Sequence, residues 1–331
     1  MEQLTDTVRT TQAADLVSFA GYGLALVDAV ESARGYAADA KAPNTRRAYR
    51  ADWQTFAGWC EARSLVALPA AADTVALYLA ERADAGLKPA TLGRSLTAIV
   101  QAHLARGHSS PLSPAVHAVL QGIRRRYGTA PTQKSPLGLD ELRRLLDALG
   151  TRPIDVRDRA LLLIGFAGAL RRSELVGIDV AHLQLDRDGL RLRLVRSKTD
   201  QEGNGRIVGI PYGGRPATCP VRAVQAWQEL RLVADGPVFV GLTKGGASTG
   251  KRLSGYDVAR IIKRRASTVG LDATRFAGHS LRAGLVTTAV RAGKAERIIM
   301  QHTGHSSAQM LRRYVRELGV FEDNAATGIG L

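Results

Sequence analysis

Two short arginine-containing motifs could hold a negatively charged phosphate. Arg171 lies in Gly-Ala-Leu-Arg-Arg-Ser-Glu-Leu, three residues before Glu174, and Arg282 follows His279 by three residues in His-Ser-Leu-Arg-Ala-Gly. The spacing of His279 and Arg282 places both side chains on one helical face, where they can meet one phosphate together. Guanidinium groups suit this task because they remain charged and grip two oxygens at once. Taken alone, each motif is more typical of a helix start or a surface ion pair.

A basic segment near the C-terminus holds a candidate nucleophile. Tyr314 follows His305 by nine positions and is flanked by arginines in Leu-Arg-Arg-Tyr-Val-Arg. A tyrosine hydroxyl, with a pKa of about 10, attacks poorly until cations lower that pKa or a base accepts its proton. Attack on a phosphodiester gives a five-coordinate phosphorus, whose extra charge Arg171 and Arg282 can meet. Without the upstream motifs, a tyrosine packed among arginines that bind a DNA backbone would be the better interpretation.

The sequence predicts neither a metal nor a nucleotide cofactor. His302 and His305 have the spacing of a zinc-binding pair, but no third or fourth ligand is evident nearby. The glycine-rich segment 245–251 lacks the Gly-x4-Gly-Lys-Ser/Thr spacing of a phosphate-binding loop. We expect this segment to be a flexible loop that faces DNA.

Composition favours a polyanionic partner and an intracellular setting. The 331 residues include 46 Lys and Arg against 30 Asp and Glu, which gives a formal net charge of +16 and a pI near 10.5. Such a balance is typical of proteins that bind nucleic acid. Cys60 and Cys219 are far apart in sequence and predict no disulfide framework, so we expect a reducing, cytoplasmic setting. Neither a secretion signal nor a membrane span is predicted.

The apolar pattern predicts two domains. Residues 1–41 are weakly patterned and are expected to form a partly mobile extension. Residues 42–127 show successive helical periods, which predict a helical bundle. A glycine and two prolines mark residues 128–137 as a linker, and residues 138–331 then make a second domain with a C-terminal tail.

Within the second domain the apolar period changes from helical to alternating. Leucines alternate with arginines over residues 189–197, which predicts a half-buried strand. A Gly-Asn-Gly turn and a returning strand at 206–210 complete a hairpin with Lys198 at its tip. A lysine at the tip of a mobile hairpin can reach the leaving group of a phosphate reaction only when DNA is bound. With helices on either side of the hairpin, the fold is expected to be mainly α with a small antiparallel β-sheet.

The ordered set of motifs resembles the tyrosine recombinases, also called the phage integrase family. The likeness covers about 280 residues, from Ala42 to the end, and its layout is most similar to that of the Cre recombinases. It implies a helical, SAM-like core-binding domain and an α+β catalytic domain that together form a C-shaped clamp around DNA. The residues that carry it are Arg171, Lys198, His279, Arg282, His305 and Tyr314.

This resemblance implies a role for each residue. Tyr314 would form a 3′-phosphotyrosine and leave a free 5′-hydroxyl, while Arg171 and Arg282 clamp the non-bridging oxygens. His305 would add a hydrogen bond to those oxygens. Lys198 would protonate the departing 5′-oxygen. Two residues would assist, His279 in proton transfer at the tyrosine and Glu174 in orienting its neighbours. Because the phosphotyrosine conserves the energy of the broken linkage, rejoining would need no cofactor.

The resemblance also implies partners. These are double-stranded DNA with paired inverted-repeat sites and, because four cuts need four tyrosines, a homotetramer on DNA built from chains that are monomeric in solution. Apolar residues after the nucleophile, Val320, Phe321, Ile329 and Leu331, would dock on a neighbouring subunit. Arg94 is the candidate for reading a base edge. The full set of candidate DNA contacts is Arg46, Arg47, Arg50, Lys88, Arg94, Arg124, Lys263, Arg264 and Arg265.

Two other functions remain compatible with these motifs. A type IB topoisomerase-like enzyme would use a similar tyrosine intermediate but would act alone to relax supercoils. A non-catalytic DNA-binding regulator on the same fold would be expected to lack a catalytic side chain, and none is missing here. The motifs do not distinguish integration, excision, resolution and transposition, and they identify no accessory protein.

Overall fold

The structure, a computed structural model, describes residues 26–130, 134–195, 205–231, 234–305, 307–309 and 311. The chain divides into two compact units, Met1–Thr132 and Gln133–Leu331, so that the division falls inside the segment predicted to be a linker. Lys198, Tyr314 and the apolar tail residues lie outside the described residues.

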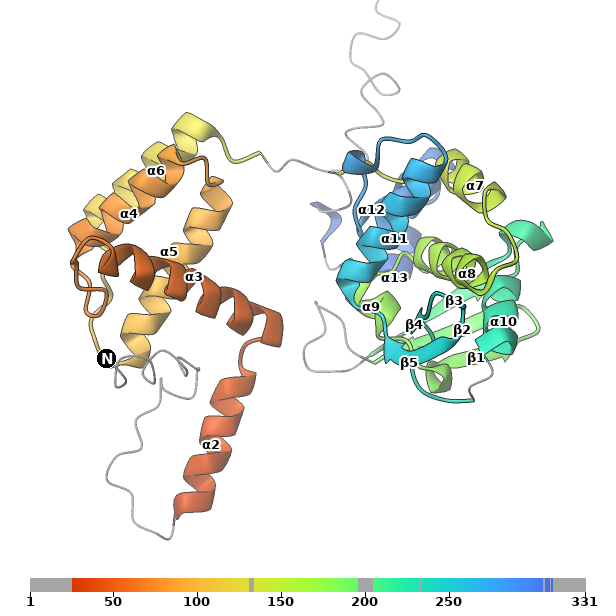
Figure 1. Cartoon of the computed structure of the whole chain (residues 1–331), viewed down its shortest axis with the longest axis horizontal. Coiled ribbons are helices and arrows are strands. Elements are labelled where there is room, and N and C mark those ends of the chain that lie inside the picture. The colour runs from red at the N-terminus through yellow and green to blue at the C-terminus, as the bar shows by residue number, and fades with distance from the viewer. Residues whose placement is uncertain are drawn as a thin grey trace, which may run out of the picture. The chain divides into compact units, whose positions relative to one another are not determined.

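The described part of the first unit is helical, and three of its five helices start at a proline. The helices are α2 (Val27–Asp39), α3 (Pro43–Glu61), α4 (Ala72–Asp84), α5 (Pro89–Ala105) and α6 (Pro114–Tyr127) (Figure 1). Proline opens α3, α5 and α6, where its fixed φ suits the first turn and its missing N–H costs nothing. The Ser113 hydroxyl also caps α6 by accepting from the Val116 N–H at 3.2 Å. Buried apolar side chains from α3 to α6 then meet in one core.

A histidine is fully buried in this core. The Nε2 atom of His103 accepts from the Ala70 N–H at 2.8 Å, so its Nδ1–H donates to the Ile99 carbonyl, also at 2.8 Å. Burial lowers the pKa of His103, and the nearby His108 lowers it further, while the bond to Ile99 opposes the change. The imidazole is therefore neutral in the folded chain.

This buried imidazole should make folding sensitive to mild acid. Because the folded pKa lies below the unfolded value of about 6.5, the unfolded chain binds the extra proton, and the free energy of unfolding falls as pH drops below that value. The loss is at most about 1.4 kcal/mol per pH unit. Urea unfolding followed by tryptophan fluorescence, at about pH 7.5 and about pH 5.5, measures it. His103→Gln should reduce the pH dependence and His117→Gln, at an exposed position of α6, should not; equal pH dependence in both variants would contradict this account.

The second unit packs helices around a small sheet. Its helices are α7 (Leu139–Asp147), α8 (Pro153–Ala167), α9 (Arg172–Val176), α10 (Pro220–Arg231), α11 (Gly255–Thr268), α12 (Ser280–Arg291) and α13 (Glu296–Thr303). Ser254 and Asp257 form the capping box at the start of α11. Among the described residues of the whole chain, no helix is long and apolar enough to cross a membrane.

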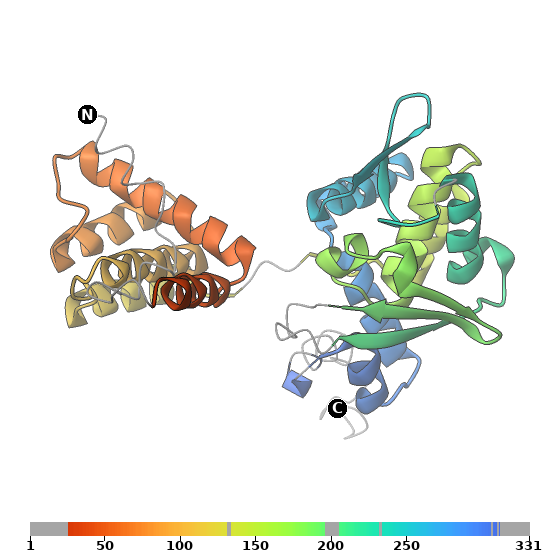
Figure 2. The ribbon, with the colours of Figure 1, turned by 90° about the horizontal axis from the view of Figure 1, so that it is seen from below.

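The main sheet is antiparallel in the order β1 (Leu183–Asp186), β2 (Gly189–Leu194) and β3 (Arg206–Pro211). The leucines of β2 are buried and its arginines exposed, as their alternation predicted, and Leu192 pairs with Val208 of β3. Figure 2 shows this hairpin, in green, lying alongside the C-terminal helices, in blue.

A second hairpin was not expected from the sequence. It pairs β4 (Val240–Leu242) with β5 (Ser248–Arg252), so the glycine-rich segment predicted to be a flexible loop partly forms a strand. All five residues of β5 are exposed, which leaves no apolar alternation that would reveal a strand in the sequence.

Candidate active site

Arg171 lies at the start of a short helix, where Glu174 of the same helix holds it in place. It is the N-cap residue of α9 and only 8% exposed. Its Nη1 donates to Glu174 Oε1 at 2.6 Å, and its backbone N–H donates to Glu174 Oε2 at 2.8 Å. Since the carboxylate holds both ends of the residue, the guanidinium has one preferred orientation. Glu174, which was predicted to orient active-site side chains, thus contacts Arg171.

Arg282 lies in the first turn of α12 and connects the turn after α8 to the last residue of α13. Its Nη1 donates to the carbonyl oxygens of Ala169 and Thr303, both at 2.7 Å. Ala169 adopts a left-handed backbone with φ of 48°, a conformation that is unusual for a residue with a Cβ atom. This turn follows α8 and leads directly to Arg171, so Arg282 and Arg171 are connected through two residues of backbone. His279 is the N-cap residue of the same helix and is exposed.

His305 follows the end of α13, where Gly304 takes the left-handed conformation that closes the helix. Burial lowers the pKa of His305 to about 4, assisted by the positive charges of Arg282, Arg171 and Arg206. The imidazole is therefore neutral near pH 7. The Thr303 hydroxyl donates to the Ile299 carbonyl at 2.7 Å and lies 2.8 Å from His305 Nδ1. Because that hydroxyl has a single proton, it accepts from Nδ1–H and leaves Nε2 of His305 as an acceptor.

A third arginine enters this cluster that sequence reasoning missed. Arg206 is the first residue of β3, and its Nη1 donates to the His302 carbonyl at 2.6 Å. Its Nη2 lies 3.6 Å from Glu174 Oε2. The alternation along β3 contained a signal for it, because Arg206 shares the inward face of the strand with Val208 and Ile210.

The structure thus brings together four of the seven residues predicted for the site. Arg171, Glu174, Arg282 and His305 are all less than a tenth exposed and are linked by the contacts above. His302 donates from Nε2 to the Ala167 carbonyl at 2.7 Å, which orients its ring. The part of the chain that the structure describes contains no group of three His, Cys, Asp or Glu residues that could hold a metal ion.

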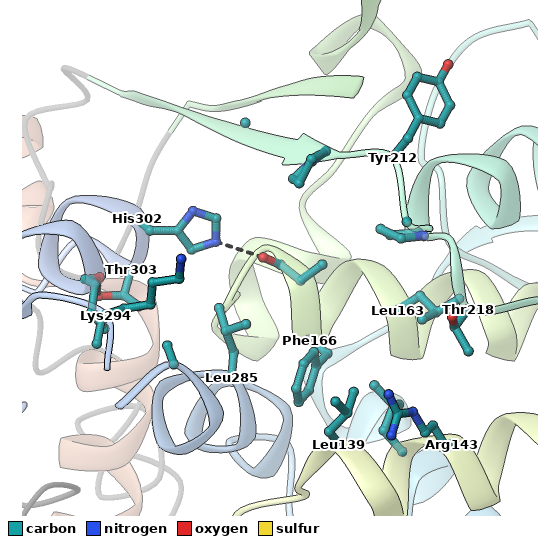
Figure 3. A pocket seen from close by; sticks show the side chains of 18 of the residues that line it. Leu139, Arg143, Leu163, Phe166, Tyr212, Thr218, Leu285, Lys294, His302 and Thr303 are labelled. Atoms are coloured by element: carbon teal, nitrogen blue, oxygen red, sulfur yellow. Dashed lines mark hydrogen bonds between the residues drawn. The ribbon is translucent and has the colours of Figure 1, made fainter. Parts of the chain in front are cut away.

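Next to this cluster is a largely apolar pocket of about 570 Å³. Figure 3 shows Phe166 and Leu285 among its lining residues, with His302 at one side and Tyr212 across from it. The pocket lies between α7, α8, the end of β3, α12 and α13, all elements of the second unit. Its lining is therefore continuous with the elements that position the cluster.

The candidate DNA contacts fall into different environments. Arg47, Arg50, Lys88, Arg124 and Lys263 are exposed, and Arg46 is half-buried. Arg94 is exposed but makes a bidentate bond to Asp52, at 2.6 and 3.1 Å, which leaves part of its guanidinium fork available.

Arg264 and Arg265 differ more from the expectation. Arg265 is buried and pairs with Asp155 at 2.8 Å and with Asp158 at 2.6 Å. These pairs give it a structural role between α8 and α11, so the prediction that it contacts DNA is not supported. The reason is the pair of buried aspartates on α8, which a sequence pattern does not connect to α11. Arg264 also pairs with Asp158, at 2.7 Å, but its side chain remains half exposed.

Comparisons with known proteins identify the family. The model of the phage integrase family matches residues 137–318, more than half of the chain. The chain is 38% identical over 290 residues to an integrase/recombinase xerD homolog of Selenomonas ruminantium, covering 86% of this chain and 85% of that protein. It therefore belongs to the phage integrase family and is a tyrosine site-specific recombinase, as the ordered motifs predicted.

Solved structures show the same fold at lower identity. A lambda integrase dimer bound to a COC′ core site matches with a TM-score of 0.55 and 19% identity, covering 88% of this chain and 94% of that chain. A lambda integrase tetramer bound to a Holliday junction matches with a TM-score of 0.51 and 18% identity, covering 74% of this chain and 64% of that one. The expected fold class, mainly α with a small antiparallel sheet, is confirmed.

Proposed function

We propose that the cluster around Arg171 and Arg282 is the site where Tyr314 attacks a DNA phosphate to form a 3′-phosphotyrosine. The observation that carries this proposal is the convergence of two buried arginines and a buried neutral histidine from three separate segments. Buried, pre-positioned cations are suited to stabilising a negative charge that arrives only with the substrate. The extra negative charge of the five-coordinate phosphorus would lie where these side chains meet.

In this proposal the protonation state of His305 changes when DNA binds. In the free protein its Nε2 is an acceptor, because its Nδ1 carries the proton and donates to the Thr303 hydroxyl. A phosphate beside the ring would favour the protonated form, which donates from both nitrogens. His305 would then donate to a non-bridging oxygen. Lys198 would protonate the departing 5′-oxygen, and His279 would assist proton transfer at Tyr314.

The first unit would act as the core-binding domain, residues 42–127, and the second as the catalytic domain, residues 138–331. Helices α3 and α6 each carry three arginines, and α5 carries Arg94. Phosphate contacts from them would give affinity that falls steeply with salt. We propose as contacts the exposed or half-exposed candidates Arg46, Arg47, Arg50, Lys88, Arg94, Arg124, Lys263 and Arg264.

The assembled enzyme would be a tetramer on paired inverted-repeat sites in cytoplasmic DNA, formed from monomers. The apolar pocket of Figure 3 supports this proposal, since a large apolar hollow on a soluble domain is typical of a protein-binding surface. The C-terminal tail of a neighbouring chain, with Val320, Phe321, Ile329 and Leu331, has the composition to fill it. The lambda integrase tetramer on a Holliday junction gives a precedent within the fold.

A plasmid assay separates recombination from topoisomerase action. The substrate carries two copies of an inverted-repeat site that the protein selects from genomic DNA, and the control plasmid carries one copy. We expect Holliday junctions and rearranged product only with two sites, because strand exchange needs two partners. Efficient relaxation of the one-site plasmid without junctions on the two-site plasmid would instead favour the type IB topoisomerase-like activity.

A further inference from the structure

Arg206 connects three parts of the active site through one side chain. It begins β3, the strand that follows the segment containing Lys198, and only 21% of its side chain is exposed. One nitrogen donates to the backbone of His302 at the end of α13, and another faces the carboxylate of Glu174 at the start of α9. The strand, α9 and the turn that carries His305 are therefore held together by one guanidinium.

The chain is shaped to admit this side chain. Gly304 has φ of 67°, and a Cβ atom there would lie 3.0 to 3.3 Å from the Nε, Cζ and Cδ atoms of Arg206. The guanidinium therefore packs against the backbone immediately before His305. Gly304 both closes α13 and leaves the space in which Arg206 lies.

The electrostatic setting of Arg206 is unfavourable for a residue with a purely structural role. Burial lowers its pKa, and the charge of Arg171 lowers it further, with Glu174 opposing both. Its Nε is buried and has no hydrogen-bond partner among the described residues. Desolvating a cation beside other cations costs free energy, and such arrangements concentrate at functional sites.

We propose that Arg206 is a positioning residue for DNA cleavage. It holds the Glu174 carboxylate that orients Arg171, and it holds the His302–His305 turn, whose Thr303 carbonyl accepts from Arg282. It thereby fixes the positions of Arg171 and Arg282, the two arginines proposed to bind the phosphate, relative to β3. This inference rests on the proposed function, because it assigns Arg206 to the same site.

Single-turnover cleavage of nicked suicide substrates tests this role with two leaving groups. One substrate carries a normal 5′-oxygen at the scissile phosphate, and the other carries a 5′-bridging sulfur, which leaves without protonation. Arg206→Met, which keeps the side-chain length but removes its charge and donors, should slow cleavage of both substrates about 100-fold. Site binding and thermal unfolding should stay close to wild type. Arg193→Met, at an exposed position of β2, is the matched control and should cleave normally.

The comparison with Lys198→Ala separates positioning from acid catalysis. Lys198→Ala should be slow on the oxygen substrate and largely rescued by sulfur, whereas Arg206→Met should not be rescued. Combining Arg206→Met with Glu174→Gln should cost little more than the more damaging single change, because both act through one network. Rescue of Arg206→Met by sulfur, or losses that multiply with Glu174→Gln, would overturn the proposal.

A second variant covers the case in which Arg206→Met does not fold. Arg206→Lys keeps the charge but cannot reach both the His302 carbonyl and Glu174, so it should lose about 10-fold in cleavage rate. A wild-type rate for Arg206→Lys would overturn the proposal. Absence of any covalent adduct with the unmodified protein would contradict the proposed function itself, whatever the Arg206 variants do.

Discussion

Replacing Tyr314 with phenylalanine should abolish the covalent protein–DNA adduct and leave site binding nearly unchanged. The change removes one oxygen, the proposed nucleophile, while the basic side chains that contact phosphates remain. The adduct is measured on a nicked suicide substrate, whose cleaved end diffuses away and traps the intermediate. Binding is measured on the same DNA by gel shift.

A second tyrosine supplies the control for this prediction. Tyr256 on α11 is 73% exposed, and Tyr256→Phe should form adduct at the wild-type rate. If Tyr314→Phe still became linked to DNA, another side chain would have to be the nucleophile. The assignment of Tyr314 would then be wrong.

Arg282→Lys should reduce the cleavage rate by roughly 100- to 1000-fold even though the positive charge is kept. The guanidinium donates to both the Ala169 and Thr303 carbonyls, and a lysine ammonium cannot reproduce that planar geometry. Single-turnover cleavage at saturating protein measures the loss. Arg291→Lys, an exposed change on the same helix, should have no effect.

Folding must be followed in the same variant. Loss of the bonds to two buried carbonyls is expected to reduce the free energy of unfolding by about 1 to 3 kcal/mol. Thermal unfolding therefore establishes that the protein is folded at the assay temperature. If a folded Arg282→Lys protein cleaved DNA at the wild-type rate, the proposal that the Arg282 guanidinium binds the scissile phosphate would be wrong.

Local signals in the sequence predicted much of the fold. Proline at the start of α3, α5 and α6, and helical spacing after it, marked the helices because these features act within a few residues. The alternation of leucine and arginine marked β2 for the same reason. The sequence did not predict strands β1 and β5, because β1 has only four residues and β5 has no buried face.

The site was predictable as an ordered set of side chains but not as a network. Arg171, Glu174, Arg282 and His305 converge, yet the contacts that hold them include backbone carbonyls of Ala169 and Thr303, which no side-chain motif reveals. Arg206 and Arg265 show that the sequence does not reveal the tertiary partners of an arginine. Both are arginines in basic or polar surroundings, and only the tertiary structure shows that one lies beside Glu174 while the other pairs with buried aspartates.

The neutral state of His305 also depends on tertiary structure. A histidine in Gly-His-Ser-Ser would ordinarily titrate near pH 6.5. Burial among three arginines lowers its pKa to about 4. No spacing rule could predict this lowered pKa, because it depends on burial and on neighbours that are distant in sequence.

The linkage between protein and DNA is the most direct test of the central claim. The adduct trapped on a suicide substrate is digested with trypsin, and the DNA-linked peptide is sequenced by mass spectrometry while the DNA ends are analysed chemically. The account predicts Tyr314 joined to a 3′-phosphate, with a free 5′-hydroxyl on the other strand end. A peptide lacking Tyr314, or a tyrosine joined to a 5′-phosphate, would contradict it.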